Sequence, residues 1–208
     1  MWQILDIRRT GWQAPELLDE DASSAVDLFS LGCVIYFCLT HGHHPFGNDE
    51  LERIANITKD EKNLSKLKND HTGVEARDLI DCLQDHDPKK RPKADKIYNH
   101  PLFWNTDTRL FFFRDPYQNW KIDVVVMEYI KNKYKYTHYD AITLLTVIRN
   151  LYEHYDELGD DVTDVVGKVP IALDKYFSTR FPALLIDVYN VLKVYCSEGK
   201  LSRYFDTE

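Results

Sequence analysis

The segment from Asp27 to Thr40 is apolar on nearly every side of a helical wheel, and the pair His41-Gly42 follows it directly. A helix that is hydrophobic all round lies in the interior of a protein, and glycine often follows the last residue of a helix. The segment therefore predicts a buried central helix that ends near Gly42. Its apolar run is shorter than the roughly 20 residues that cross a bilayer, so we expect a soluble chain.

Composition and charge exclude several classes of protein. Hydrophobic residues make up 44% of the chain, which favours a packed globular protein over a disordered one. The net charge of −8 gives no general attraction for nucleic acid, so any RNA binding needs a local basic patch. There is no signal-peptide pattern and the cysteines form no CxxC pair, so we expect reduced thiols and a cytoplasmic location.

The pattern of polar and apolar residues predicts an all-α protein in two packed units. Helical periodicity marks four later segments, at roughly 120–135, 140–156, 158–166 and 181–197. No alternating strand of any length is visible in the sequence. The polar stretch from Arg114 to Asn119 contains a proline and predicts a linker or a tight corner. We therefore expect domains at residues 1–114 and 115–208.

Five short motifs in the first domain resemble the second half of the large lobe of a protein kinase. They are, in order, Ala14-Pro15-Glu16, Asp27-Leu28-Phe29-Ser30-Leu31-Gly32, His44-Pro45-Phe46-Gly47, Asp87-Pro88-Lys89-Lys90-Arg91-Pro92 and His100-Pro101-Leu102-Phe103-Trp104. The resemblance implies a buried ion pair between Glu16 and Arg91, because a buried carboxylate without a partner costs several kcal/mol. Alternatively, Arg91 merely opens a helix with Pro92 in its first turn.

The parts of a kinase that transfer phosphate are absent from the chain. It has no glycine-rich loop, no strand lysine, no His-Arg-Asp motif and no Asp-Phe-Gly motif, so we expect no kinase activity and no bound cofactor. In kinases the residue matching Asp27 holds the catalytic-loop backbone. Without that loop, Asp27 either caps its own helix or lacks its usual partner. We also expect the apolar helix to expose a patch that favours self-association.

The histidines of the segment Thr40-His41-Gly42-His43-His44 raise the question of a metal site. No nearby cysteine or carboxylate completes a plausible ligand set. We therefore expect a structural loop with a turn fixed by Pro45, and no metal.

The second domain carries a further resemblance. The stretches Lys131–Leu158, Val166–Pro170 and Asp174–Leu192 are similar to the nuclease domain that follows the kinase domain in the inositol-requiring enzyme family. These kinase/endoribonucleases act in the unfolded-protein response and are related to ribonuclease L. The resemblance implies endoribonuclease activity, pairing with itself or with a full-length family member, and ATP or ADP with magnesium in the complete proteins. It implies nuclease residues at four positions: Tyr136, Arg149, Asn150 and His154.

The residues themselves support such a site. On a helical wheel, one apolar stripe contains Ala141, Leu144, Leu145, Ile148, Leu151, Tyr152 and Tyr155. Asn150 and His154 lie roughly opposite this stripe, one helical turn apart, and Arg149 lies on the flank. A solvated helix face without function is the alternative. RNA cleavage by its own 2′-hydroxyl needs a base, an acid and a cation, for which we assign Tyr136, His154 and Arg149. Asn150 is expected to be the orienting residue of this site.

Some charges around the candidate site favour RNA binding and others oppose it. Lys131, Lys133 and Lys135 alternate with tyrosines and are expected to bind RNA, although a lysine-rich helix end explains them equally well. A run of acids after the candidate helix repels RNA, and it consists of Glu153, Asp156, Glu157, Asp160, Asp161 and Asp164. In several relatives a basic or histidine residue stands where this chain has Glu153, and the junction near 105–120 is shorter here.

Three interpretations therefore stay open. The first is a metal-independent endoribonuclease that cleaves stem-loop RNA to 2′,3′-cyclic phosphate and 5′-hydroxyl ends. The second is a catalytically silent regulatory module that pairs with a full-length kinase/endoribonuclease. The third is a kinase remnant without a function of its own.

Overall fold

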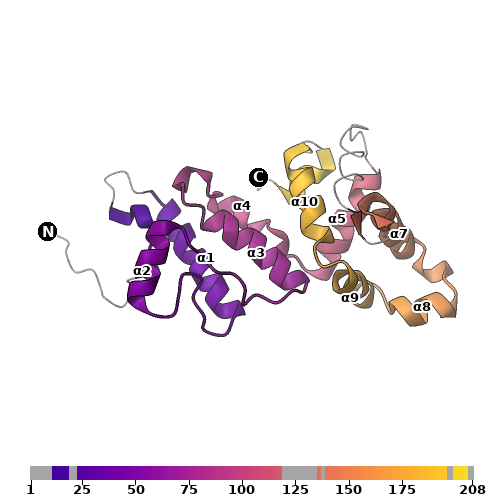
Figure 1. The fold of residues 1–208 in the computed structure, drawn as a ribbon. Helices are drawn as coiled ribbons and strands as arrows, with labels where there is room; N and C mark the ends of the chain where they lie inside the picture. The colour runs from indigo at the N-terminus through magenta and orange to yellow at the C-terminus, as the bar shows by residue number, and fades with distance from the viewer. Residues whose placement is uncertain (1–10, 19–22, 119–134, 137–138, 196–198, 206–208) are drawn as a thin grey trace. The chain divides into compact units, whose positions relative to one another are not determined.

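The structure is a computed structural model, and it describes residues 11–18, 23–118, 135–136, 139–195 and 199–205. The fold is mainly α-helical, in agreement with the predicted class (Figure 1). The chain divides into two compact units. Unit 1 contains residues 1–69 and 76–97, and unit 2 contains residues 70–75 and 98–208.

Unit 1 is built around α1 (Ala25–Leu39), whose end agrees with the sequence prediction. It also contains α2 (Glu50–Lys59), most of α3 (His71–Leu83) and α4 (Ala94–Tyr98), together with the short 3-10 helices η2 (Pro15–Leu18) and η3 (Pro88–Lys90). The N–H of Thr40 donates to the carbonyl of Tyr36 at 3.0 Å, and Gly42 follows with a φ of 108°. Such a positive φ favours glycine, which explains why the helix ends here.

One face of α1 is buried and another is exposed. Phe29, Cys33 and Tyr36 are buried, and Gly32 packs so closely on Gln84, the residue after α3, that a Cβ there would lie 2.8 Å from Cγ of Gln84. On another face Leu31 is 37% exposed, Val34 46% and Phe37 40%. The prediction of a helix buried all round is therefore wrong for this face, whereas the predicted exposed apolar patch is present. Asp27 is also exposed, and the structure gives it no side-chain partner among the described residues.

The ion pair between Glu16 and Arg91 is present in unit 1. Nη1 of Arg91 lies 2.5 Å from Oε1 of Glu16, and Nη2 lies 3.1 Å from Oε2, so the contact is bidentate. The same guanidinium donates to the carbonyls of Ala25 and Asp85. The Arg91 side chain is fully buried and that of Glu16 is 12% exposed, so both charges depend on this contact for compensation.

His44 is buried in a cluster of rings. Its Nδ1 accepts a hydrogen bond from the N–H of Phe46 at 3.2 Å, and its ring meets Trp12 edge-on at 4.5 Å between centroids. Burial, with the nearby charge of Arg53, lowers the pKa of His44 to about 4. His44 is therefore neutral at physiological pH and packs as a structural residue.

Unit 2 is a bundle of helices, and a short C-terminal segment packs against its core. Its elements are η4 (Pro101–Phe103), α5 (Thr106–Gln118), β1 (Lys135–Tyr136), β2 (Tyr139–Asp140), α7 (Ala141–Glu153), η5 (Tyr155–Glu157), α8 (Asp160–Val166), α9 (Ile171–Arg180), α10 (Leu184–Tyr195) and η6 (Gly199–Tyr204). β1 and β2 form a two-residue antiparallel pair. The predicted helix at 120–135 lies mostly outside the described residues, and α9 was not predicted as a separate helix.

Helix α5 corrects the predicted linker. Residues 114–118 continue α5 without a break, although they include Pro116. The helix is held because Phe112 and Phe113 are buried in the core of unit 2 and because Asp115 accepts a hydrogen bond from the hydroxyl of Tyr204 at 2.7 Å. The boundary that we predicted between residues 114 and 115 falls inside this helix, and all of α5 belongs to unit 2.

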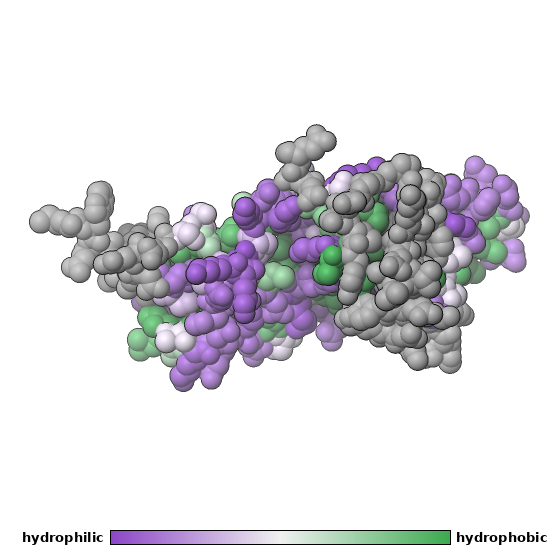
Figure 2. All heavy atoms as spheres, turned by 90° about the horizontal axis from the view of Figure 1, so that it is seen from above, coloured by the Kyte–Doolittle hydropathy of each residue, from purple (hydrophilic) through white to green (hydrophobic). Residues whose placement is uncertain are grey.

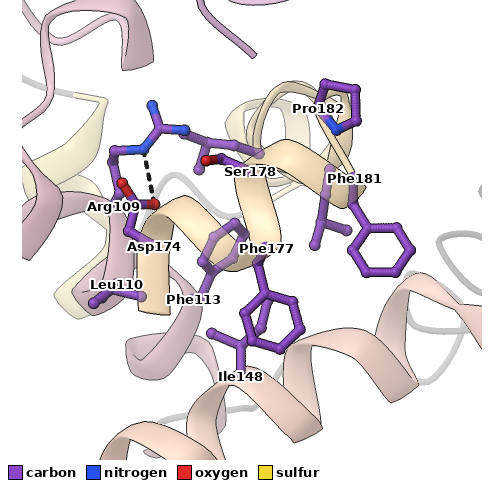
Figure 3. A pocket seen from close by; sticks show the side chains of 11 residues that line it. Arg109, Leu110, Phe113, Ile148, Asp174, Phe177, Ser178, Phe181 and Pro182 are labelled. Atoms are coloured by element: carbon purple, nitrogen blue, oxygen red, sulfur yellow. Dashed lines mark hydrogen bonds and ion pairs between the residues drawn. The ribbon is translucent and has the colours of Figure 1, made fainter. Parts of the chain in front are cut away.

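The core of unit 2 is apolar, and Arg109 forms a buried ionic cluster at its side. Phe113, Ile148 and Phe177 come from three helices and point toward one another (Figure 3). Arg109 contacts the carboxylate of Asp174 at 3.2 Å and that of Glu75 at 2.7 Å. All of these side chains except that of Glu75 line a cavity of about 10 Å³, which has room for about one water molecule and is too small for a substrate.

No helix in the described part of the chain has both the length and the apolar character needed to cross a bilayer.

Candidate active site

Helix α7 presents the candidate nuclease residues. It starts at Asp140, whose Oδ1 accepts a hydrogen bond from the N–H of Thr143 at 2.9 Å, a typical N-cap. The predicted apolar stripe faces the core: Ala141, Leu144, Leu145 and Ile148 are all buried. Because this stripe fixes the rotation of the helix, Asn150 and His154 are directed to solvent, as predicted.

Arg149, Asn150 and His154 all lie at the C-terminal end of α7. Nε and Nη2 of Arg149 donate to Oδ1 of Asn150 at 3.1 and 2.6 Å. His154 caps the helix, with its N–H bonded to the carbonyl of Asn150 at 3.0 Å. Its side chain is 59% exposed, and Nδ1 lies 3.4 Å from Oε1 of Glu157. An imidazole, an amide and a guanidinium therefore share one exposed end of a helix.

Tyr136 is placed only through its backbone. In the pairing of β1 with β2 it stands opposite Tyr139, next to the start of α7. The side chains of Lys135 and Tyr136, like Lys131 and Lys133 as a whole, lie outside the described residues. The roles predicted for these four residues therefore stay predictions.

Glu153, the first residue of the acidic run, contacts a cation that was not predicted from the sequence, Arg114. Nε of Arg114, on α5, lies 3.7 Å from Oε1 of Glu153. At the end of unit 2 where α8 lies, Figure 2 shows hydrophilic residues with hydrophobic ones among them. No sequence signal pointed to Arg114, because it is 39 positions from Glu153 and stood in a predicted linker.

The side chains at this end of α7 determine what chemistry is available there. Among the described residues, no three side chains of the types that bind metals lie close enough together to hold an ion. The arrangement offers a proton donor or acceptor in His154, a permanent cation in Arg149 and an amide that orients the cation. These groups suit acid–base chemistry at a phosphate.

Two protein families match the chain. Residues 7–103 match the protein kinase domain, and residues 109–205 match the family Ribonuclease 2-5A. The second match contains α7 and all three residues at its exposed end.

Similar proteins combine both parts. The chain is 40% identical to the serine/threonine-protein kinase/endoribonuclease IRE1b of Arabidopsis thaliana, an alignment that covers 90% of this chain and 24% of the relative. It is 33% identical to IRE2 of Homo sapiens, covering 94% of this chain and 24% of the relative. It is 31% identical to an inactive IRE1-like protein of Arabidopsis thaliana, covering 95% of this chain and 43% of the relative.

The chain thus spans about a quarter of the length of the first two of these relatives. Its two matched segments follow one another in the order that the motifs predicted. The chain belongs to the inositol-requiring kinase/endoribonuclease family, with one part that matches the protein kinase domain and one part that matches Ribonuclease 2-5A.

Proposed function

We propose that the chain is a metal-independent endoribonuclease that cleaves stem-loop RNA as part of unfolded-protein signalling. The observation that carries this proposal is the cluster of Arg149, Asn150 and His154 at an exposed helix end, inside the segment that matches Ribonuclease 2-5A. A related protein of Schizosaccharomyces pombe is named a sensor for unfolded proteins in the ER, which supports the cellular role.

The proposed reaction is attack by the RNA's own 2′-hydroxyl on the neighbouring phosphorus. The bond from the 2′-oxygen to phosphorus forms and the bond from phosphorus to the 5′-oxygen breaks, leaving a 2′,3′-cyclic phosphate and a 5′-hydroxyl. Tyr136, in its phenolate form, takes the proton of the 2′-hydroxyl, and His154, in its protonated form, gives a proton to the departing 5′-oxygen. Arg149 stabilises the charge that develops on the phosphoryl oxygens.

The role of Asn150 follows from its contact with Arg149. Its Oδ1 accepts hydrogen bonds from two nitrogens of the guanidinium, which restricts the rotation of that group. A guanidinium held in this way loses less conformational freedom when it meets a phosphate. Asn150 therefore acts as a positioning residue for Arg149.

The test is cleavage of a stem-loop RNA by the purified chain in EDTA, with wild type, His154→Ala and His43→Ala compared. His43 is an exposed histidine of unit 1 and serves as the matched control. We expect cyclic-phosphate products from wild type and from the control, and a loss of about 10²- to 10⁴-fold in His154→Ala. Equal rates for His154→Ala and wild type would contradict the proposal.

A second candidate function is a catalytically silent module that pairs with a full-length family member. The identity of 31% to a relative named inactive, together with the acidic run after α7, favours this alternative. It predicts no cleavage by wild type at high protein concentration, together with measurable binding to a full-length kinase/endoribonuclease.

A further inference from the structure

Glu153 places a carboxylate directly beside His154 in the candidate site. It is the last residue of α7 and directly precedes His154. The C-terminal end of a helix already carries a partial negative charge, so another anion there is unfavourable for the helix and for an approaching phosphate. If the chain cleaves RNA, this carboxylate must be kept away from the phosphate.

Arg114 is held in a fixed position opposite this carboxylate. Its guanidinium stacks on the ring of Phe111 at 4.3 Å from the centroid, and Nε and Nη2 contact Oδ1 of Asp115 at 3.2 and 3.0 Å. The ring of Phe111 in turn meets Tyr152 of α7 edge-on at 6.1 Å. The cation is therefore oriented by α5 and lies within 3.7 Å of Oε1 of Glu153.

The charges around Arg114 balance only when Glu153 is included. Asp115 is buried and also contacts Arg203, while the hydroxyl of Tyr204 donates to it. Asp115 is therefore shared by Arg203 and Arg114, and the two cations together match two carboxylates, those of Asp115 and Glu153. By contrast, the exposed Asp156 in the same acidic run has no cationic partner among the described residues.

We propose that Arg114 is a positioning residue of the candidate site: it holds the carboxylate of Glu153 against α5 and so keeps an anion away from the RNA phosphate that His154 serves. This inference rests on the proposed endoribonuclease function. Arg114 acts through Glu153 and does not touch the RNA. Its removal therefore affects RNA binding, and hence KM, more than kcat.

The experiment measures kcat and KM for stem-loop RNA at low and high salt in six chains: wild type, Arg114→Gln, Glu153→Gln, Asp156→Asn and the two double variants that contain Arg114→Gln. Glutamine at position 114 keeps a donor for Asp115, and a melting curve of each variant checks its folding. Arg114→Lys is a seventh chain that keeps the charge and still permits the test if Arg114→Gln fails to fold.

We expect Arg114→Gln to raise KM about fivefold at low salt, with kcat within about twofold of wild type and a smaller effect near 1 M salt, where the screening length is about 3 Å. Glu153→Gln is expected to change KM less than about twofold in wild type and to restore it in Arg114→Gln. Asp156→Asn should change KM by the same factor in wild type and in Arg114→Gln. Arg114→Lys should stay within about twofold of wild type.

Two results would overturn the inference while leaving the nuclease intact. The first is a change in KM on Glu153→Gln that is equal in wild type and in Arg114→Gln. The second is a change in KM on Asp156→Asn that depends on residue 114 as strongly as the change on Glu153→Gln does. If only Arg114→Lys folds, a KM raised as much as about fivefold in that variant would overturn it too. Failure of wild type to cleave any RNA would instead overturn the proposed function.

Discussion

Two glutamate–arginine pairs in this chain have the same chemistry and different consequences. In unit 1, Glu16 and Arg91 form a bidentate contact whose side chains are 12% and 0% exposed. In unit 2, Glu153 and Arg114 approach only to 3.7 Å, with side chains 37% and 25% exposed. Burial decides the difference: the first pair holds the fold, whereas the second determines the charge around an exposed helix end.

The largest effect is expected from breaking the buried pair. Glu16→Gln leaves the guanidinium of Arg91 without its compensating charge in the interior, and we expect a loss of about 3 to 5 kcal/mol in the free energy of unfolding. Denaturant unfolding followed by circular dichroism measures this loss.

The matched comparison is Glu153→Gln, which removes the same charge from the exposed pair. We expect its unfolding free energy to change by less than about 1 kcal/mol. Equal losses in the two variants would show that burial does not distinguish the pairs.

A second effect concerns the buried carboxyl of Glu75, which interacts with the charges of Arg109, Asp174 and Asp70. Burial raises the pKa of Glu75 to about 7, although the contact with Arg109 opposes this shift. Since the unfolded carboxyl ionises near its ordinary pKa of 4.5, the folded state binds the extra proton between these values, and stability falls as the pH rises from about 4.5 to 7.

The measurement is the unfolding free energy of wild type minus that of Glu75→Gln as a function of pH. Glutamine imitates the neutral carboxyl, so we expect this difference to fall by up to about 3 kcal/mol between pH 4.5 and 7.5. A difference that stays constant or rises with pH would mean that Arg109, and not burial, controls the carboxyl.

The smallest effect is expected at the exposed apolar face of α1. Leu31, Val34 and Phe37 lie at the surface of unit 1, and apolar surface favours association. We expect the weight-average mass in sedimentation to rise with concentration for wild type and to rise less for a Leu31→Ser, Val34→Ser double variant. A strictly monomeric wild type would contradict this prediction.

Sequence patterns predicted those parts of the fold that depend on local periodicity. The stripe from Ala141 to Ile148 fixes the core face of α7 and therefore the exposed face that carries His154. Likewise, the helical periodicity at 181–197 corresponds to α10, in which Leu184, Leu185, Val188 and Leu192 are buried.

The parts that the sequence did not reveal depend on distant partners. A proline among polar residues indicated a linker at 114–119, yet α5 continues because Asp115 is held by Tyr204, 89 positions later. The same error hid Arg114, whose significance depends on its contact with Glu153 from another helix. Helix α9 was missed as a separate element, although its residues Leu173 and Phe177 belong to the core.

The most direct test of the central claim is a single 2′-deoxy substitution in a cleaved stem-loop RNA. The cleavage site is first mapped with wild-type protein in EDTA, and the 2′-hydroxyl is then removed only from the nucleotide on the 5′ side of that bond. If the exposed end of α7 promotes attack by this hydroxyl, cleavage at the site stops while binding is retained. Unchanged cleavage of the substituted RNA would contradict the account.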